Sequence, residues 1–339
     1  MKTLVLEKPG KLSLVEHPSP TKPGRGEVLA RVRRIGVCGT DIHAFHGRQP
    51  FFEYPRILGH ELAVEIEAVG PGIDPGRIGQ LCTVEPYLAC GKCFACERGR
   101  TNCCENMQVL GVHVDGGMSE RFLLPASHCH CHPDLSADQL ALVEMLAIGC
   151  HAVERAAVQS GEQVLVIGAG PIGLSVVQFV AAAGAHPSVL DIHAGRLELC
   201  QTKFGVKRVL NAGEENIPER LRELCGGALP TVVFDATGNQ RSMEAAFQYP
   251  AHGGRLVFVG LFPGNVSLED PNFHRRELTL LASRNALSQD FPRILDLIAS
   301  GHIDTSSWIT HRASLDEVPQ CFEGWTRPES GVLKAMIDL

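Results

Sequence analysis

The sequence predicts an α/β protein in which a doubly wound parallel sheet is inserted into a β-rich domain. The first third of the chain is rich in glycine and proline, which separate short alternating or β-branched runs. Between residues 163 and 283, six apolar runs alternate with helical stretches. The residues after 284 are too few for a third core, so we expect residues 285–339 to return and complete the first domain.

The first domain is predicted to span residues 1–150 and to consist mainly of short strands. Turn clusters such as Pro71–Gly76 separate runs with strand composition. The candidate strands include Val28–Val32, Leu62–Val69 and Leu81–Val84. The apolar stretch Leu140–Ala157 has Gly149 as its sole helix breaker, and it predicts a helix that joins the two domains.

The second domain is predicted to span residues 151–284 and to hold the parallel sheet. Continuous apolar runs are typical of strands whose two faces are both covered by helices. Val164–Ile167 is such a run, and six predicted strands with helical crossovers favour a doubly wound sheet. The predicted strands are Val164–Ile167, Ser188–Asp191, Arg208–Asn211, Val232–Asp235, Arg255–Gly260 and Leu278–Ser283.

Composition restricts the possible functions and partners. With 44% hydrophobic and 20% charged residues, the chain has the composition of an ordinary globular protein. Its net charge of -7 disfavours a nucleic-acid partner, because phosphate binding needs a basic face. No apolar run is long enough for a signal peptide or a membrane span, so we expect a cytoplasmic protein. There its thirteen cysteines are expected to bind metal or fill the core rather than form disulfides.

A dinucleotide-binding motif follows the first strand of the second domain. The run Gly168–Gly173 fits G-x-G-x-x-G and opens a helix, whose N-terminus favours a pyrophosphate. Asp191 follows 23 residues after Gly168, where it is predicted to accept hydrogen bonds from a ribose. Its charge would repel the extra phosphate of NADP, so NAD is the predicted cofactor. The alternative is a turn whose glycines serve packing alone.

Arg196 is predicted either to flank the adenine or to be a solvated helix residue. The complete predicted cofactor site comprises Gly168, Gly170, Pro171, Ile172, Gly173, Asp191, Arg196, Gly260, Ser283 and Arg284.

Four cysteines are spaced for a structural metal site. Cys90, Cys93 and Cys96 form C-x2-C-x2-C, and either Cys103 or Cys104 supplies a fourth thiolate. Four sulfur ligands fill the tetrahedral shell of zinc and leave no open position, so the site is predicted to be structural. The alternatives are an iron–sulfur cluster or core cysteines. The fourth cysteine comes too late for the compact ferredoxin run, and no proline follows it.

A second set of metal ligands is predicted in the first domain. Cys38, His60 and a glutamate, Glu61 or Glu144, supply three ligands and leave the open position that a catalytic zinc needs. Alone, Cys38 is more often a small core residue and His60 a structural histidine. Their joint occurrence with the glycine motif and the four cysteines favours an alcohol dehydrogenase, in which zinc polarises the alcohol and the nicotinamide accepts hydride.

Together these motifs resemble the zinc-containing medium-chain dehydrogenases, in the branch of the sorbitol and threonine dehydrogenases, over essentially the whole chain. The resemblance implies a GroES-like catalytic domain interrupted by a Rossmann domain, with the active site in the cleft between them. It implies NAD, one catalytic and one structural zinc ion, and a homodimer or homotetramer. It also implies Cys104 as the fourth structural ligand, and both Glu61 and Glu144 near the catalytic metal.

The resemblance further implies a proton relay through Thr40 and His43, with Asp41 orienting His60. The chain departs from the family at Met145, where a proline commonly follows the glutamate.

Three stretches resemble bacterial hexonate 5-dehydrogenases of the L-galactonate and L-gulonate type: Gln49–Pro55, Asp235–Gln240 and Ser283–Ala286. The expected reaction is therefore oxidation of a secondary alcohol of a sugar acid or polyol to the ketone. Arg284, with Arg48 or His113, is a candidate for binding a substrate carboxylate, and Arg284 is alternatively a cofactor contact.

Other functions remain as alternatives to this one. They are a threonine-type or sugar-phosphate dehydrogenase, a non-catalytic NAD sensor and a zinc-free quinone reductase. The segment His128–His132 is interpreted as an ordinary strand, because alternating residues face opposite sides.

Overall fold

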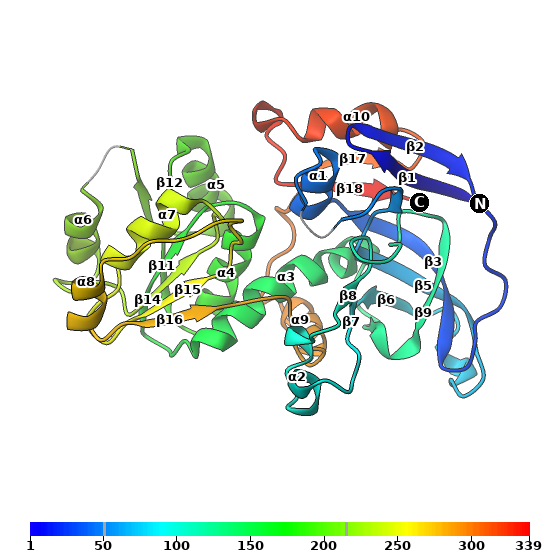
Figure 1. Cartoon of the computed structure of the whole chain (residues 1–339), viewed down its shortest axis with the longest axis horizontal. Coiled ribbons are helices and arrows are strands. Elements are labelled where there is room, and N and C mark those ends of the chain that lie inside the picture. Colours follow the sequence, from blue (N-terminus) through cyan, green and yellow to red (C-terminus); the bar gives the residue numbers. More distant parts are fainter. Residues whose placement is uncertain (50–51, 214–215) are drawn as a thin grey trace. The chain divides into compact units, whose positions relative to one another are not determined.

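The computed structural model describes residues 1–49, 52–213 and 216–339, and the chain divides into two compact units (Figure 1). The first unit comprises Met1–Met145, Leu287–Gly301 and Trp308–Leu339. The second comprises Leu146–Ala286 and His302–Ser307. Helix α3 (Ala137–Ala156) runs from one unit into the other. Within the described part of the chain, no helix combines the length and apolar character that a bilayer crossing requires.

The second unit contains a six-stranded parallel sheet in the order β13-β12-β11-β14-β15-β16, which confirms the predicted doubly wound fold. Its central strands are fully buried, as their unbroken apolar sequences require. The strands are β11 (Gln163–Ile167), β12 (His186–Asp191), β13 (Arg208–Asn211), β14 (Val232–Asp235), β15 (Arg255–Phe258) and β16 (Thr279–Ala282). The helices are α4 (Pro171–Ala182), α5 (Ala194–Phe204), α6 (Ile217–Leu224), α7 (Gln240–Ala245) and α8 (Asp270–Arg275).

The first unit is built on a seven-stranded sheet in the order β10-β6-β5-β3-β18-β17, with β9 also paired to β3. Strand β18 comes from the end of the chain and pairs with β3, so the last residues complete a sheet begun near residue 27 (Figure 1). These strands are β3 (Glu27–Gly36), β5 (Glu61–Val69), β6 (Leu81–Val84), β9 (Arg121–Pro125), β10 (Cys129–Cys131), β17 (Ile309–Ser314) and β18 (Lys334–Asp338).

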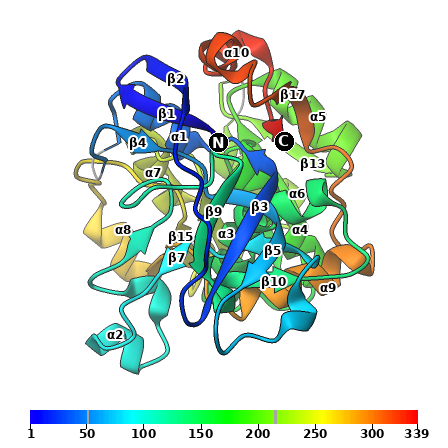
Figure 2. The same ribbon diagram turned by 90° about the vertical axis from the view of Figure 1, so that its right-hand side faces the viewer.

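Smaller elements complete the first unit. A three-stranded sheet has the order β2-β1-β4, and β7 pairs with β8 in a separate two-stranded sheet. Helix α2 lies at the tip of a lobe that projects from the first unit in both views (Figures 1 and 2). The elements are β1 (Lys2–Lys8), β2 (Lys11–Glu16), β4 (Arg56–Ile57), β7 (Tyr87–Leu88), β8 (Gln108–Val109), α1 (Gly39–Phe45), α2 (Phe94–Glu97), α9 (Asp290–Ala299) and α10 (Val318–Trp325).

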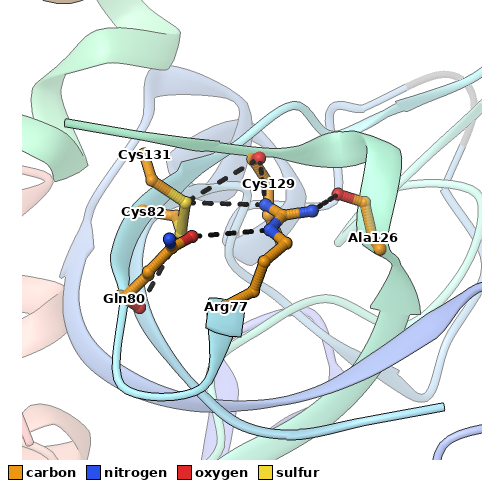
Figure 3. Close-up of a disulfide and its surroundings, with 6 residues drawn as sticks. All are labelled: Arg77, Gln80, Cys82, Ala126, Cys129 and Cys131. Atoms are coloured by element: carbon orange, nitrogen blue, oxygen red, sulfur yellow. Dashed lines mark hydrogen bonds between the residues drawn. A yellow bond between two sulfur atoms is a disulfide. The ribbon is translucent and has the colours of Figure 1, made fainter. Parts of the chain in front are cut away.

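A disulfide joins Cys82 to Cys131, so the expectation that the cysteines form no disulfides is wrong for this pair (Figure 3). The two residues are directly opposite in the antiparallel pair β6–β10, with their Cα atoms 3.9 Å apart. The Arg77 guanidinium donates to the carbonyls of Ala126 and Cys129, each at 2.8 Å, beside the sulfurs. Closing a loop between cysteines 49 positions apart stabilises the fold by about 4 kcal/mol in the chain-entropy description.

Gly149 allows a close approach between two helices within the second unit. A Cβ at this position of α3 would lie 2.1 Å from Ser175 Oγ and 2.7 Å from the Ser175 carbonyl carbon in α4. The Ser175 hydroxyl in turn donates to the Leu146 carbonyl at 3.0 Å. The contact involves main-chain atoms, so a side chain at position 149 would force the helices apart.

We expect Gly149→Ala to destabilise the protein by about 1–3 kcal/mol, because overpacking outweighs the gain from removing a helix glycine. The measurement is the urea midpoint followed by circular dichroism. Gly195→Ala is the matched control, since a Cβ there in α5 meets nothing within 4 Å. This variant should remain within about 1 kcal/mol of the wild type. Equal midpoints for the two variants would contradict the prediction.

Candidate active site

The four predicted cysteine ligands converge on one point in the lobe that contains α2. The sulfurs of Cys90, Cys93, Cys96 and Cys104 all lie within 4.8 Å of one another. Cys93 Sγ is 3.5 Å from Cys96 Sγ and 3.9 Å from Cys104 Sγ. A closed group of four sulfurs at this spacing fits a tetrahedral thiophilic cation such as zinc.

Of the adjacent cysteines 103 and 104, the buried one is placed to bind the metal. Cys104 is buried and belongs to the convergent group, whereas the adjacent Cys103 is exposed.

Backbone N–H groups, that of Lys92 foremost, lower the pKa of Cys90 to about 6. A thiolate is therefore available near neutral pH without a basic side chain in the group.

A second group of ligands forms where β3 ends and β5 begins. Cys38, His60 and Glu61 offer a sulfur, a nitrogen and an oxygen within 4.8 Å of one another. The register of the two strands pairs Gly36 with Glu61, which brings Cys38 back to His60. A Cβ at Gly36 would lie 2.2 Å from Glu61 Oε2, so a larger residue here would displace the Glu61 carboxylate.

The donor set of this group fits a catalytic zinc. Zinc is a borderline-soft cation and accepts a soft thiolate, an imidazole and a hard carboxylate together. His60 and Glu61 are buried, and His60 Nδ1 has no hydrogen-bond partner among the described residues. A thiol, an imidazole and a carboxylate that converge in the protein interior are a strong indication of a cation site.

Asp41 lies beside His60 but does not hydrogen-bond to it. Its Oδ1 is 3.9 Å from His60 Nδ1, beyond hydrogen-bond range, while Oδ2 accepts from the Cys38 main-chain N–H at 2.9 Å. Burial lowers the pKa of His60, but the nearby Cys38 and Asp41 outweigh it and hold that pKa well above its ordinary value. The predicted orienting role of Asp41 stays a prediction, and its visible contact is with the Cys38 backbone.

Each of the two candidate glutamates has a partner that sequence reasoning missed. The Lys334 ammonium lies 2.6 Å from both carboxylate oxygens of Glu61 and donates to the Val37 carbonyl at 3.1 Å. The Tyr87 hydroxyl donates to Glu144 Oε1. The structure brings Glu61 into the ligand group, whereas Glu144 is not one of its three converging residues. One local signal for Lys334 exists, a lysine beginning the otherwise apolar run Lys334–Ile337.

The predicted relay residues lie on helix α1, three positions apart and therefore on one face. Thr40 is half-buried and His43 is exposed. Burial lowers the pKa of His43, and so does the charge of Arg48. No hydrogen bond joins the Thr40 and His43 side chains among the described residues, so the relay stays a prediction.

The predicted substrate-binding residues are scattered. His113 lies in the loop after β8 and accepts the Val109 N–H through Nδ1 at 3.1 Å. Arg48 is exposed just after α1, and Arg284 follows β16 in the second unit. Pro50 and Phe51, in the stretch resembling hexonate dehydrogenases, lie outside the described residues.

The glycine motif spans the turn after β11 and the first residues of α4, and its three glycines differ in their surroundings. Gly168 has a positive φ of 97°. A Cβ at Gly173 would lie 1.8 Å from the Gly168 carbonyl oxygen, so this glycine permits close packing of helix and strand. A Cβ at Gly170 would meet nothing within 4 Å, which leaves the approach to the helix N-terminus open. Pro171 begins α4, and Ile172 follows it.

The remaining predicted cofactor residues lie near the carboxyl ends of the strands in the same sheet, apart from Arg196 in α5. Asp191 ends β12, and its carboxylate accepts the Ala169 N–H at 2.7 Å and the His193 N–H at 2.8 Å. It therefore ties β12 to the glycine turn. Gly260 follows β15, where a Cβ would be 2.3 Å from Gly238 N, and Ser283 follows β16. This edge is where doubly wound sheets bind ligands.

Both parts of the chain match known protein families. Residues 24–134 match the alcohol dehydrogenase GroES-like domain, and residues 171–300 match the family of zinc-binding dehydrogenases.

Individual proteins resemble the whole chain. The L-galactonate-5-dehydrogenase of Escherichia coli K12 is 42% identical over 323 residues, which cover 95% of this chain and 94% of the relative. A structure described as a short chain alcohol dehydrogenase of E. coli CFT073, complexed with NADH, has a TM-score of 0.93 at 30% identity and covers 100% and 99% of the two chains. A zinc-binding dehydrogenase of Sinorhizobium meliloti 1021, bound to NADP, has a TM-score of 0.91 at 29% identity with the same coverage.

Adjacent cysteines provide a test of the four-sulfur group. We expect Cys104→Ser to lose about one zinc ion per chain, because three thiolates no longer close the tetrahedron. Cys103→Ser changes the exposed neighbour and should keep the metal content of the wild type. Zinc is measured by atomic absorption after gel filtration. Loss of metal from the Cys103 variant, or none from the Cys104 variant, would refute this ligand set.

Proposed function

The chain belongs to the family of zinc-binding alcohol dehydrogenases with a GroES-like domain, and we propose that it oxidises a secondary alcohol of a sugar acid to the ketone with NAD as the oxidant. Membership of the family makes the chain an oxidoreductase and confirms the resemblance inferred from its motifs. The main structural support for this reaction is the convergence of Cys38, His60 and Glu61. The 42% identity to an L-galactonate-5-dehydrogenase supports a hexonate as the substrate.

The proposed reaction removes a proton and a hydride from the alcohol. The alcohol loses its hydroxyl proton and the hydride on its carbon, the hydride reduces NAD⁺, and the products are the ketone, NADH and a proton. Zinc, when held by Cys38, His60 and a carboxylate, supplies a Lewis acid that makes the hydroxyl more acidic.

Two side chains of the first unit transfer the hydroxyl proton to solvent in this proposal. Thr40 passes it to His43, whose exposed imidazole releases it to solvent. Partial burial lowers the pKa of His43 and the charge of Arg48 lowers it further, which favours the neutral ring that can accept a proton. Lys334 neutralises Glu61 and so moderates the negative charge around the ligand group.

The choice of NAD over NADP is proposed to depend on Asp191. Its carboxylate is 7% exposed and is already held by two backbone N–H groups, so it has a fixed position at the end of β12. A fixed negative charge accepts ribose hydroxyls and repels a phosphate on the same ring. One structural relative was solved with NADH and another with NADP, so both cofactors occur among similar proteins.

We expect the wild type to prefer NAD and Asp191→Asn to shift the ratio of kcat/KM for NADP to that for NAD upward by about tenfold. The substitution removes the charge while keeping the size of the side chain. Steady-state kinetics with both cofactors measure the ratio, and thermal unfolding checks that the β12–turn connection survives. A wild type that works better with NADP would disprove the cofactor assignment.

The substrate class is tested by NADH formation at 340 nm over a panel of hexonates, free polyols and threonine. We expect the highest kcat/KM with L-galactonate or L-gulonate and loss of activity after zinc chelation. Turnover of polyols but not of hexonates would overturn the sugar-acid assignment. The absence of turnover with any hydroxylated compound would overturn the proposed reaction itself.

A further inference from the structure

The two glutamates near the ligand group are held by chemically different partners. Glu61 is paired through both oxygens with the Lys334 ammonium, and both side chains are at most 2% exposed. Glu144 is 4% exposed and accepts a hydrogen bond from a neutral phenol, that of Tyr87, through Oε1 alone. The ammonium cancels the charge of its carboxylate, whereas the phenol orients Glu144 and leaves its charge intact.

Glu144 is close enough to the ligand group to interact with it electrostatically. Burial raises the pKa of Glu144, while the neighbouring His60 lowers it and Glu61 raises it. Within the described residues, the Tyr87 hydroxyl is the sole hydrogen-bond donor to this carboxylate. A buried carboxylate that loses its donor either finds another partner or takes up a proton, and a nearby cation favours the first outcome.

The Tyr87 ring is itself held by a stack of aromatic side chains from distant parts of the chain. Phe291 in α9 lies edge-on to it, with ring centroids 6.3 Å apart. Phe291 also stacks with His130 in β10, with ring centroids 5.0 Å apart and an interplanar angle of 16°. His130 Nε2 lies 3.0 Å from Glu85 Oε2, two residues before Tyr87. The segment His128–His132 thus contributes one ring, that of His130, to the aromatic cluster that contains Tyr87.

We propose that Tyr87 is a positioning residue that holds Glu144 beside the Cys38–His60–Glu61 group but out of it, so that a ligand position stays open for the substrate oxygen. The proposal rests on the zinc site of the proposed function. A thiolate, an imidazole and two carboxylates together would fill a tetrahedral shell. The phenol prevents this by giving the second carboxylate a better-placed partner within the protein.

Tyr87→Phe tests the role, because it removes the hydroxyl and keeps the ring that contacts Phe291. Released from the phenol, Glu144 is expected to join the metal. Zinc release to a chelating indicator should slow at least threefold, and the visible bands of the cobalt(II)-substituted protein should shift. Cys38→Ser, which removes the thiol of this ligand group, identifies the zinc phase and the cobalt bands that belong to this site.

Two controls separate positioning from general damage. In a Glu144→Gln background, Tyr87→Phe should no longer alter zinc release, because the carboxylate through which it acts is gone. Tyr54→Phe removes another hydrogen-bonded hydroxyl, which donates to the Ala44 carbonyl at 2.5 Å, and should leave the cobalt spectrum unchanged.

Unchanged or faster zinc release in Tyr87→Phe would overturn the proposal, and so would an equal effect in the Glu144→Gln background. A merely structural role for Tyr87 predicts faster loss of metal, so the direction of the change decides between the two roles. These readouts use neither substrate nor nucleotide. A failure of the substrate panel is therefore distinguishable from a failure of the role assigned to Tyr87.

Discussion

The site of the first unit depends on the position of β3 between two antiparallel partners. On one side, its pairing with β5 sets Gly36 opposite Glu61. On the other, β18 sets Met336 opposite the same Gly36, which places Lys334 within reach of Glu61. The ligand group and its counter-charge are thus assembled by backbone registers. A slip of one residue in either pairing would turn these side chains to the other face.

Charge balance explains why this group of residues is suited to a cation. Asp41, Glu61 and Glu144 are all buried near one another, and Lys334 is the buried ammonium that offsets one of them. Buried carboxylates are costly unless they are paired or bind a metal. A divalent ion held with Cys38 and His60 would compensate the remaining negative charge. Stability and metal affinity are therefore coupled at this place.

Sequence patterns predicted the features that depend on residues close together in the chain, namely the strands of the parallel sheet and the four-cysteine group. The runs of the parallel sheet were recognisable because each has an apolar, often β-branched centre and alternates with a helical stretch, and Arg208–Asn211 has the same bounds in the structure. The four cysteines were recognisable because one short segment contains them all. Lys334, Tyr87 and the partner of Cys82 were missed. Each contact joins residues far apart in sequence, 273, 57 and 49 positions, and its register depends on the complete fold.

The bridge between Cys82 and Cys131 gives the chain a covalent ring, and that ring contains the whole four-cysteine lobe. The lobe around α2 is consequently tethered at both of its ends, whatever the state of the metal. A protease that cuts once inside it yields two polypeptides that migrate together on a denaturing gel until a thiol is added. A nick in this region would then pass unnoticed in any assay of chain length performed without reductant.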